Sequence, residues 1–139
     1  MFRVVIADDE ELIREGLKSM LMRCGDIEVV GFAQNGREAF EMCESLSPDL
    51  VLMDLSMPQC DGVEGTKLIK QKYNNIKILI LTVIYHKEKV SEALNNGADG
   101  YALKDIDGEE LVRLVKGTAE GLHVIHRNVL IKMERESVR

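Results

Sequence analysis

Short apolar runs alternate with longer amphipathic segments along most of this 139-residue chain. The runs are continuously apolar and rich in β-branched residues, which is typical of strands covered by helices on both faces. Between them, apolar residues recur at helical spacing, so consecutive strands are joined by right-handed helical crossovers. The pattern predicts an α/β fold with a doubly wound parallel sheet. We expect five strands, at about residues 3–7, 28–33, 50–54, 77–82 and 100–103.

Polar residues at the ends of the amphipathic segments indicate where the helices begin and end. Asp9-Glu10-Glu11 puts negative charge at the start of the first helix, where the helix dipole favours it. Asn35 is a candidate cap for the second helix, and Asn95-Asn96-Gly97 is a signal for the end of the fourth. The third helix is expected at about residues 63–73, and the fifth is expected to start near Asp107.

Composition excludes several classes of protein. With 45% hydrophobic and 30% charged residues, the chain fits one folded domain, and no apolar run approaches the roughly 18 residues of a membrane span. The first strand begins almost at Met1 without a signal peptide, which predicts a cytoplasmic protein. A net charge of -6 argues against direct binding of nucleic acid and suits a divalent cation or a basic partner.

The cysteines and histidines do not form a recognisable metal-binding pattern. Cys24, Cys43 and Cys60 are widely spaced, match no zinc motif and are expected to be inert thiols. His123 and His126 have no further ligand at a supporting spacing, so a metal site there is disfavoured.

Five polar side chains stand where the apolar runs end. Asp8 and Asp9 follow the first run and Asp54 follows the third, while Thr82 and Lys104 end the fourth and fifth. The carboxyl ends of parallel strands meet at one edge of a sheet, so these side chains should converge. Three carboxylates gathered at one point are unfavourable unless a cation offsets them, and carboxylate oxygens suit Mg²⁺.

Such a cluster can also carry out phosphoryl chemistry. An ionised carboxylate can attack phosphorus and form an aspartyl phosphate, a role that we assign to Asp54. Lys104 would neutralise one phosphoryl oxygen, and the Thr82 hydroxyl would donate to another. Catalysis of this kind depends mostly on positioning and electrostatics.

The stretches that carry these residues resemble the receiver domains of two-component response regulators, over residues 2 to about 120. They are Val4-Val5-Ile6-Ala7-Asp8-Asp9-Glu10, Pro48-Asp49-Leu50-Val51-Leu52-Met53-Asp54-Leu55-Ser56-Met57-Pro58 with Asp61-Gly62, Ile78-Leu79-Ile80-Leu81-Thr82, and Gly97-Ala98-Asp99-Gly100-Tyr101-Ala102-Leu103-Lys104. Arg14-Glu15-Gly16-Leu17 and Val29-Val30-Gly31, with Gly97 to Tyr101, resemble the NarL/FixJ subfamily. In that subfamily a LuxR-type helix-turn-helix domain follows the receiver and binds DNA.

The resemblance implies a flavodoxin-like sheet with strand order 2-1-3-4-5, and it implies roles for the site residues. Asp54 would accept the phosphoryl group from a phosphohistidine on a sensor histidine kinase. Asp9 and Asp54 would bind Mg²⁺ directly, together with the backbone carbonyl of Ser56, and Asp8 would act partly through water. On phosphorylation the Thr82 hydroxyl would move to the phosphoryl group, and the Tyr101 ring would swing into the space that it leaves. An ordinary half-exposed edge residue is the alternative for Tyr101.

The resemblance also divides the chain. Residues 1–120 would form the receiver, and residues 121–139 would be a linker or short helix toward a C-terminal DNA-binding domain that this chain lacks. A frayed tail is an equal alternative for this last segment. Phosphorylation would promote a homodimer, and the output would be control of transcription. A stand-alone receiver that acts by protein contact remains the alternative function.

The sequence departs from the family pattern in two places. The frequent Lys-Pro after the last strand is Lys104-Asp105 here, and because a cis bond is unfavourable without proline we expect a trans bond. Val83 and Ile84 follow Thr82, and their apolar bulk predicts a phosphoryl group that is shielded from attacking water and long-lived.

Two other classes share parts of this pattern. A flavodoxin-like cofactor binder needs a Ser/Thr/Gly-rich phosphate loop after its first strand, where Asp8-Asp9-Glu10 would repel phosphate. A phosphatase of the haloacid dehalogenase type needs two aspartates separated by one residue, and here they are adjacent. We therefore predict a signalling switch rather than a turnover enzyme.

Overall fold

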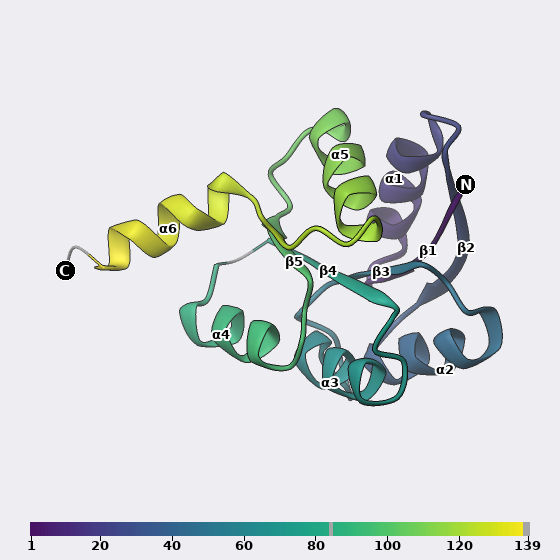
Figure 1. Ribbon diagram of the computed structural model, residues 1–139, viewed down its shortest axis with the longest axis horizontal. Coiled ribbons are helices and arrows are strands. Elements are labelled where there is room, and N and C mark those ends of the chain that lie inside the picture. The colour runs from purple at the N-terminus through teal and green to yellow at the C-terminus, as the bar shows by residue number, and fades with distance from the viewer. Residues whose placement is uncertain (84, 138–139) are drawn as a thin grey trace.

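A parallel sheet lies between two layers of helices in the computed structural model, which describes residues 1–83 and 85–137 (Figure 1). The strands are β1 (Phe2–Ala7), β2 (Ile27–Ala33), β3 (Leu50–Met53), β4 (Lys77–Thr82), β5 (Gly100–Leu103) and β6 (Val124–Ile125). The helices are α1 (Glu11–Met22), α2 (Gly36–Leu46), α3 (Gly62–Lys72), α4 (Lys87–Asn95), α5 (Gly108–Ala119) and α6 (Arg127–Ser137). The order β2-β1-β3-β4-β5 confirms the predicted α/β fold, with β6 added beside β5.

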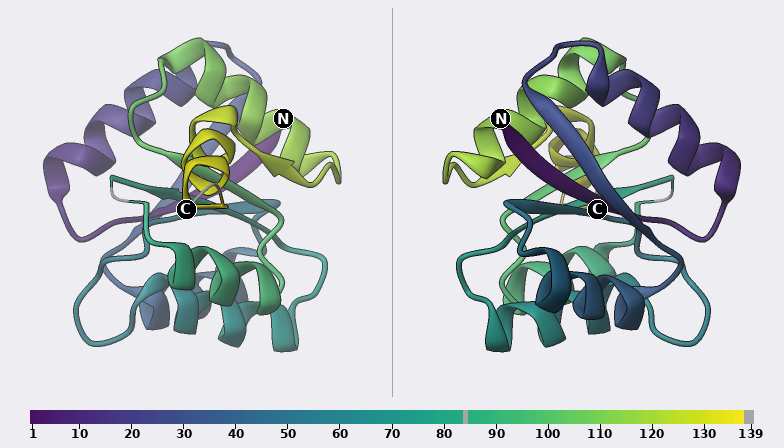
Figure 2. Two further views of the ribbon diagram at one scale, coloured as in Figure 1. Left: turned by 90° about the vertical axis from the view of Figure 1, so that its left-hand side faces the viewer. Right: turned by 90° about the vertical axis from the view of Figure 1, so that its right-hand side faces the viewer.

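Alternate residues of each strand enter two separate cores, because successive side chains in a strand point to opposite faces. On one face, Val51 and Ile78 lie in a core cluster with residues of α2, α3 and α4. On the other face, Leu52 and Leu79 lie in a second cluster with residues of α1 and α5. Figure 2 shows these two helical layers on opposite sides of the sheet. Burial of both faces explains why the strands are continuously apolar in sequence.

The expected five-strand sheet needs one correction, because β6 is a sixth parallel strand. Val124 pairs with Gly100 and Ile125 with Tyr101. The backbone N–H of Val124 donates to the carbonyl of Asp99, and that of His126 donates to the carbonyl of Tyr101. These bonds give partners to backbone groups on the outer side of β5 that would otherwise be unpaired. Two residues are too short to show a period in sequence.

Polar side chains cap the starts of α2, α3 and α5, and the cap predicted at Asn35 is confirmed. Asn35 and Asp107 each accept a hydrogen bond from a backbone N–H three residues later, and Asp61 does the same for α3. These side chains satisfy N–H groups that have no partner within the helix. No cis peptide bond occurs among the described residues, so the expected trans Lys104-Asp105 bond is confirmed. None of the described helices is long and apolar enough to cross a membrane.

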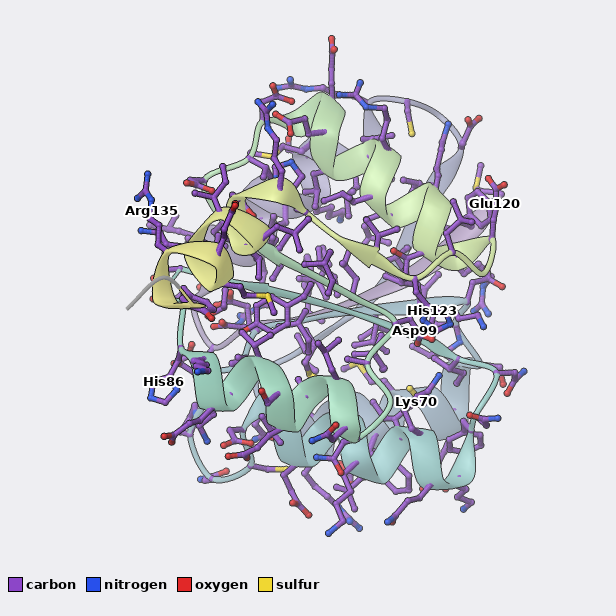
Figure 3. All side chains as sticks on the ribbon, turned by 60° about the vertical axis from the view of Figure 1, so that its left-hand side comes forward. Lys70, His86, Asp99, Glu120, His123 and Arg135 are labelled. Carbon is purple, nitrogen blue, oxygen red and sulfur yellow. The ribbon has the colours of Figure 1, made fainter. Side chains whose placement is uncertain are left out.

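A buried ion pair lies at the amino-terminal ends of the strands, opposite the end that carries the predicted site. Lys70 of α3 contacts Asp99 at 3.0 Å, and the same carboxylate oxygen accepts from the backbone N–H of Ile78 (Figure 3). Lys70 also donates to the carbonyls of Asn74 and Ile76. Because both charges are satisfied by several hydrogen bonds, this pair ties α3 to the starts of β4 and β5.

Close packing between α2 and α3 depends on two glycines. A Cβ atom on Gly65 would lie 2.7 Å from the Cα of Gly36 and 3.0 Å from the Cε of Met53. The backbone cannot move aside as a flexible side chain could. A methyl group at this position would therefore push the two helices apart.

We expect Gly65→Ala to destabilise the protein by about 1–3 kcal/mol, as overpacking commonly does. Gly16→Ala is the matched control, since it also lies in a helix but has open space around its Cβ position. This control should stabilise by about 0.5–1 kcal/mol through helix propensity. Urea denaturation measures both variants, and equal effects at the two positions would contradict the packing argument.

Candidate functional site

The structure brings the predicted site residues together at the carboxyl edge of the sheet. Asp8 and Asp9 follow β1, Asp54 follows β3, Thr82 ends β4 and Lys104 follows β5. Each of the three aspartates has a carboxylate oxygen within 4.8 Å of those of the other two. Parallel pairing of β1 with β3 produces this convergence, because Ala7 and Met53 stand side by side at the strand ends.

The three carboxylates differ in exposure. Asp8 and Asp54 are only 1% and 6% exposed, whereas Asp9 is open to solvent. The backbone fixes the buried pair, since the Asp54 N–H donates to the carbonyl of Ala7. The Asp8 carboxylate accepts from the N–H of Glu10 at 2.9 Å. Asp9 is therefore the most accessible carboxylate to an incoming cation.

One lysine is shared between the two buried carboxylates. The ammonium group of Lys104 donates to Oδ2 of Asp8 and lies 3.5 Å from Oδ2 of Asp54. Its side chain is 12% exposed, so little water screens these contacts. A single cation offsets two negative charges here, and the site retains excess negative charge that would attract a further cation.

Of the two buried carboxylates, Asp54 is the less satisfied. Its Oδ1 atom is buried and accepts no hydrogen bond from any described residue. Burial is the main cause that raises the pKa of Asp54, and the Asp8 charge adds to it. Lys104 and the backbone N–H of Ser56 act in the opposite direction. A desolvated carboxylate with one free oxygen is suited to bind a metal or to act as a nucleophile.

An open cleft of about 600 Å³ gives access to this edge. The lining residues come from the ends of β1, β3 and β4, from the loop before α3, and from α4: Asp9, Leu55, Ser56, Met57, Pro58, Asp61, Thr82, His86 and Lys89. His86 and Lys89 are site residues that the sequence did not indicate. Lys89 lies 3.5 Å from Asp61, so an ion pair joins α4 to the N-terminus of α3 across the cleft. No motif connects residues so far apart, so only the fold reveals this pair.

The two predicted switch residues lie on neighbouring strands. Thr82 is buried, and its carbonyl accepts from the N–H of Lys104 at 2.7 Å. Tyr101 is fully buried, which differs from the half-exposed edge residue considered as an alternative. Its hydroxyl finds no partner among the described residues, and burial raises its pKa, with lesser contributions from Tyr85 and Asp54. Tyr101 shares a core cluster with Val129 of α6, and α6 packs against β5, the strand that carries Tyr101.

The predicted shielding of a phosphoryl group finds no support at Val83. This side chain is 68% exposed and does not line the cleft. Ile84, the second residue of that prediction, lies outside the described residues. The long lifetime stays a prediction.

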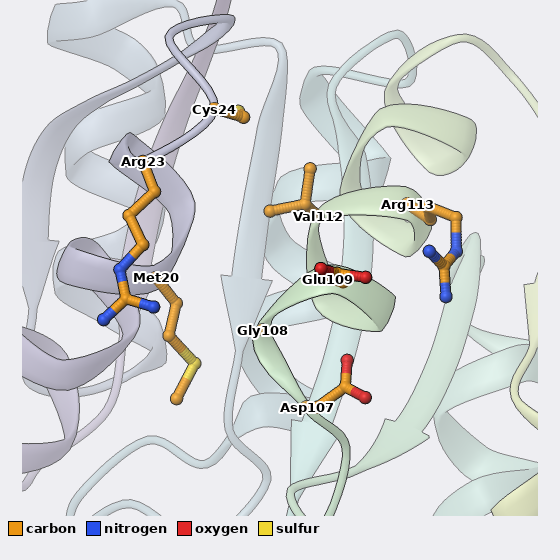
Figure 4. A pocket seen from close by; sticks show the side chains of 8 residues that line it. All are labelled: Met20, Arg23, Cys24, Asp107, Gly108, Glu109, Val112 and Arg113. Carbon is orange, nitrogen blue, oxygen red and sulfur yellow. The ribbon is translucent and has the colours of Figure 1, made fainter.

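A larger groove of about 740 Å³ lies elsewhere, between the C-terminal end of α1 and the N-terminal end of α5 (Figure 4). Its lining combines apolar Met20 and Val112 with charged Arg23, Glu109 and Arg113. None of the predicted site residues lies in this groove. His126, considered above as a metal ligand, instead pairs with Glu110 at 2.5 Å.

Comparison with known proteins identifies the class of protein that this fold and site define. The response regulator receiver domain matches residues 4–116, and the chain belongs to that family. Transcriptional regulatory protein LnrK of Bacillus subtilis is 40% identical over 136 residues, which are 98% of this chain and 62% of LnrK. VraR of Staphylococcus aureus is 41% identical over 94% of this chain and 63% of its own length. The chain thus spans about three-fifths of these relatives.

A solved structure agrees over the whole chain. A LuxR-family two-component response regulator from Aurantimonas sp. SI85-9A1 has a TM-score of 0.92 at 29% identity, covering 100% of this chain and 99% of that one. The likeness therefore includes the segment that forms β6 and α6. The predicted resemblance to LuxR-type response regulators is confirmed.

We expect Asp54→Asn to stabilise the metal-free protein at neutral pH by on the order of 1 kcal/mol. The amide replaces a buried carboxylate whose pKa is raised by burial, so a desolvated charge is removed. Lys104 keeps Asp8 as its partner. Because protonated Asp54 is favoured in the folded state, its contribution to stability is present at low pH and lost as the pH rises through its raised pKa. The gain should therefore shrink on acidification.

Urea denaturation in a metal chelator, repeated from neutral pH downward, measures this difference. Asp26→Asn serves as the control, because Lys116 lowers the pKa of that exposed carboxylate. A loss of stability in Asp54→Asn at neutral pH would show that the carboxylate is well satisfied and would contradict the argument.

Proposed function

We propose that Asp54 accepts a phosphoryl group from a phosphohistidine on a sensor histidine kinase, and that the chain acts as a signalling switch. One observation carries the proposal: the buried carboxylate of Asp54 has a free oxygen and stands beside Lys104. Its chain neighbours Leu55 and Ser56 line the open cleft at this edge, together with Asp9 and Thr82. Membership of the receiver family supports it.

The chemistry is a direct displacement at phosphorus. An oxygen of ionised Asp54 attacks phosphorus, the bond from phosphorus to the imidazole nitrogen of the donor breaks, and that nitrogen keeps the electron pair and regains a proton from solvent. Lys104 would neutralise one oxygen of the transferred group. The Thr82 hydroxyl would donate to another. The protein contributes positioning and charge, which is typical of phosphoryl transfer.

The donor set fits Mg²⁺, a cation that prefers carboxylate and carbonyl oxygens. Asp9, Asp54 and the backbone carbonyl of Ser56 would hold it directly, and Asp8 partly through water. When bound, Mg²⁺ supplies positive charge that screens Asp54 from an incoming phosphoryl group. The clustered oxygens and the unpartnered Oδ1 of Asp54 support this assignment.

Thr82 and Tyr101 would carry the change away from the site. When the Thr82 hydroxyl moves to the phosphoryl group, it leaves space that the buried ring of Tyr101 would enter. Packing of α6 against β5, with Tyr101 and Val129 in one core cluster, supports a route from the site to the tail.

The output of the switch is proposed from the relatives. LnrK of Bacillus subtilis is named a transcriptional regulatory protein, and so is DegU of Brevibacillus brevis. We infer that residues 1–120 form the receiver and residues 121–139 lead toward a DNA-binding domain, with phosphorylation promoting a homodimer. In this role the protein would act in the cytoplasm and would catalyse only its own phosphorylation and dephosphorylation. The length of the native gene product separates this role from that of a stand-alone receiver.

Incubation with a small phosphodonor and Mg²⁺ should add one phosphoryl group to the protein. Asp54→Asn should abolish this addition because the nucleophile is gone, and Asp26→Asn should leave it unchanged. Intact mass spectrometry reads both results, and chelation of the metal should suppress labelling of the wild type. Equal labelling of wild type and Asp54→Asn would refute the assignment.

Loss of the lysine should slow the transfer without removing the nucleophile. We expect Lys104→Met to lower the rate of labelling by about 10²–10³-fold, as removal of one charge-stabilising group commonly does. Lys116→Met is the matched control, since it breaks a similar lysine–aspartate pair on the surface. A stopped time course of labelling compares the two, and a Lys104→Met rate equal to that of the control would exclude a role for Lys104.

A further inference from the structure

The segment after α5 returns to the sheet and attaches to the strand that carries the lysine of the site. After β6 pairs with β5, α6 starts at Arg127 and extends away between the levels of α4 and α5 (Figures 1 and 2). Val129 in its first turn is fully buried. The start of α6 is thus anchored in the receiver core.

Asn128 continues the hydrogen bonding of β5 where β6 ends. Its Oδ1 accepts from the N–H of Leu103 at 3.3 Å, and its Nδ2 donates to the carbonyl of Leu103 at 3.4 Å. The same Nδ2 donates to the carboxylate of Asp105 at 2.7 Å, the shortest contact of the three. Leu103 and Asp105 flank Lys104, so one side chain of α6 holds the residues on both sides of the site lysine.

A second contact fixes the position of Asn128. The Nδ1 atom of His126 accepts from the backbone N–H of Asn128 at 3.2 Å. A neutral imidazole with Nδ1 as acceptor carries its proton on Nε2, which then donates to Glu110 of α5 at 2.5 Å. The first turn of α6 is therefore attached to α5 as well as to β5.

We propose that Asn128 is a positioning residue that couples the Lys104 loop to α6. The proposal rests on the proposed function, in which a phosphoryl group forms on Asp54. When that group draws Lys104 away from Asp8, Leu103 and Asp105 adjust with it, and Asn128 passes the adjustment to α6. By reciprocity, an ordered α6 holds Lys104 ready for the anion.

Hydrogen exchange with and without a phosphoryl mimic tests this coupling. The trifluoroberyllate anion with Mg²⁺ should slow amide exchange at the Asp54 loop and also in α6 of the wild type. Asn128→Ala should keep the slowing at the Asp54 loop under saturating anion and lose it in α6. The apparent Kd of the anion should rise about 5- to 10-fold, in line with the loss of one or two hydrogen bonds. Lys132→Ala, on an exposed position of α6, should behave as wild type.

Swapping the amide of Asn128 and the carboxylate of Asp105 should restore the coupling to α6. Asn128→Asp places a carboxylate against Asp105 and should uncouple α6 at least as strongly as Asn128→Ala. Adding Asp105→Asn supplies a donor again, and the double variant should recover most of the anion-dependent slowing in α6. Recovery depends on the hydrogen bond and not on the bulk of either side chain.

Three results would overturn the proposal, and they differ in what else they affect. If the anion still slows amide exchange in α6 of Asn128→Ala, Asn128 has only a structural role. Anion binding that protects the Asp54 loop but not α6 in the wild type would remove the coupling and leave the proposed function intact. Absence of protection at the Asp54 loop itself would refute the proposed function and this proposal together.

Discussion

The gathering of three carboxylates at one edge of the sheet is the constraint on which the rest of the structure depends. Asp8 and Asp54 are held in place by the parallel pairing of β1 and β3, and both are removed from water. Mutual repulsion and desolvation would drive them apart if the strands were free to move. The apolar cores on both faces of the sheet supply the rigidity that keeps them together.

Lys104 makes this arrangement tolerable but not neutral. Its ammonium group contacts both buried carboxylates, and Asp54 still retains an unpartnered oxygen and a raised pKa. The lysine reaches the cluster from the loop after β5, the strand at which the tail is attached. Charge balance at the site and the position of the tail therefore involve the same short segment of chain.

Much of the site could be predicted from sequence, because parallel topology places residues at strand ends at one edge. The predicted convergence of Asp8, Asp9 and Asp54 needed only the order of apolar runs. Contacts between distant segments left no such signal. The two-residue β6 was too short to show a period, and the Lys89–Asp61 pair joins helices with no shared motif. The full burial of Tyr101 was not predictable, because the sequence did not indicate that β6 and α6 would pack against β5.

Attachment of the tail also determines what kinds of partner β5 can accept. β6 and the Asn128 amide occupy its outward hydrogen-bonding groups, so a foreign strand cannot be added there without displacing the tail. Among the described strands, the two edges of the sheet are β2 and the two-residue β6. A partner that binds at β5 must therefore contact side chains and helix surfaces there, or displace the tail.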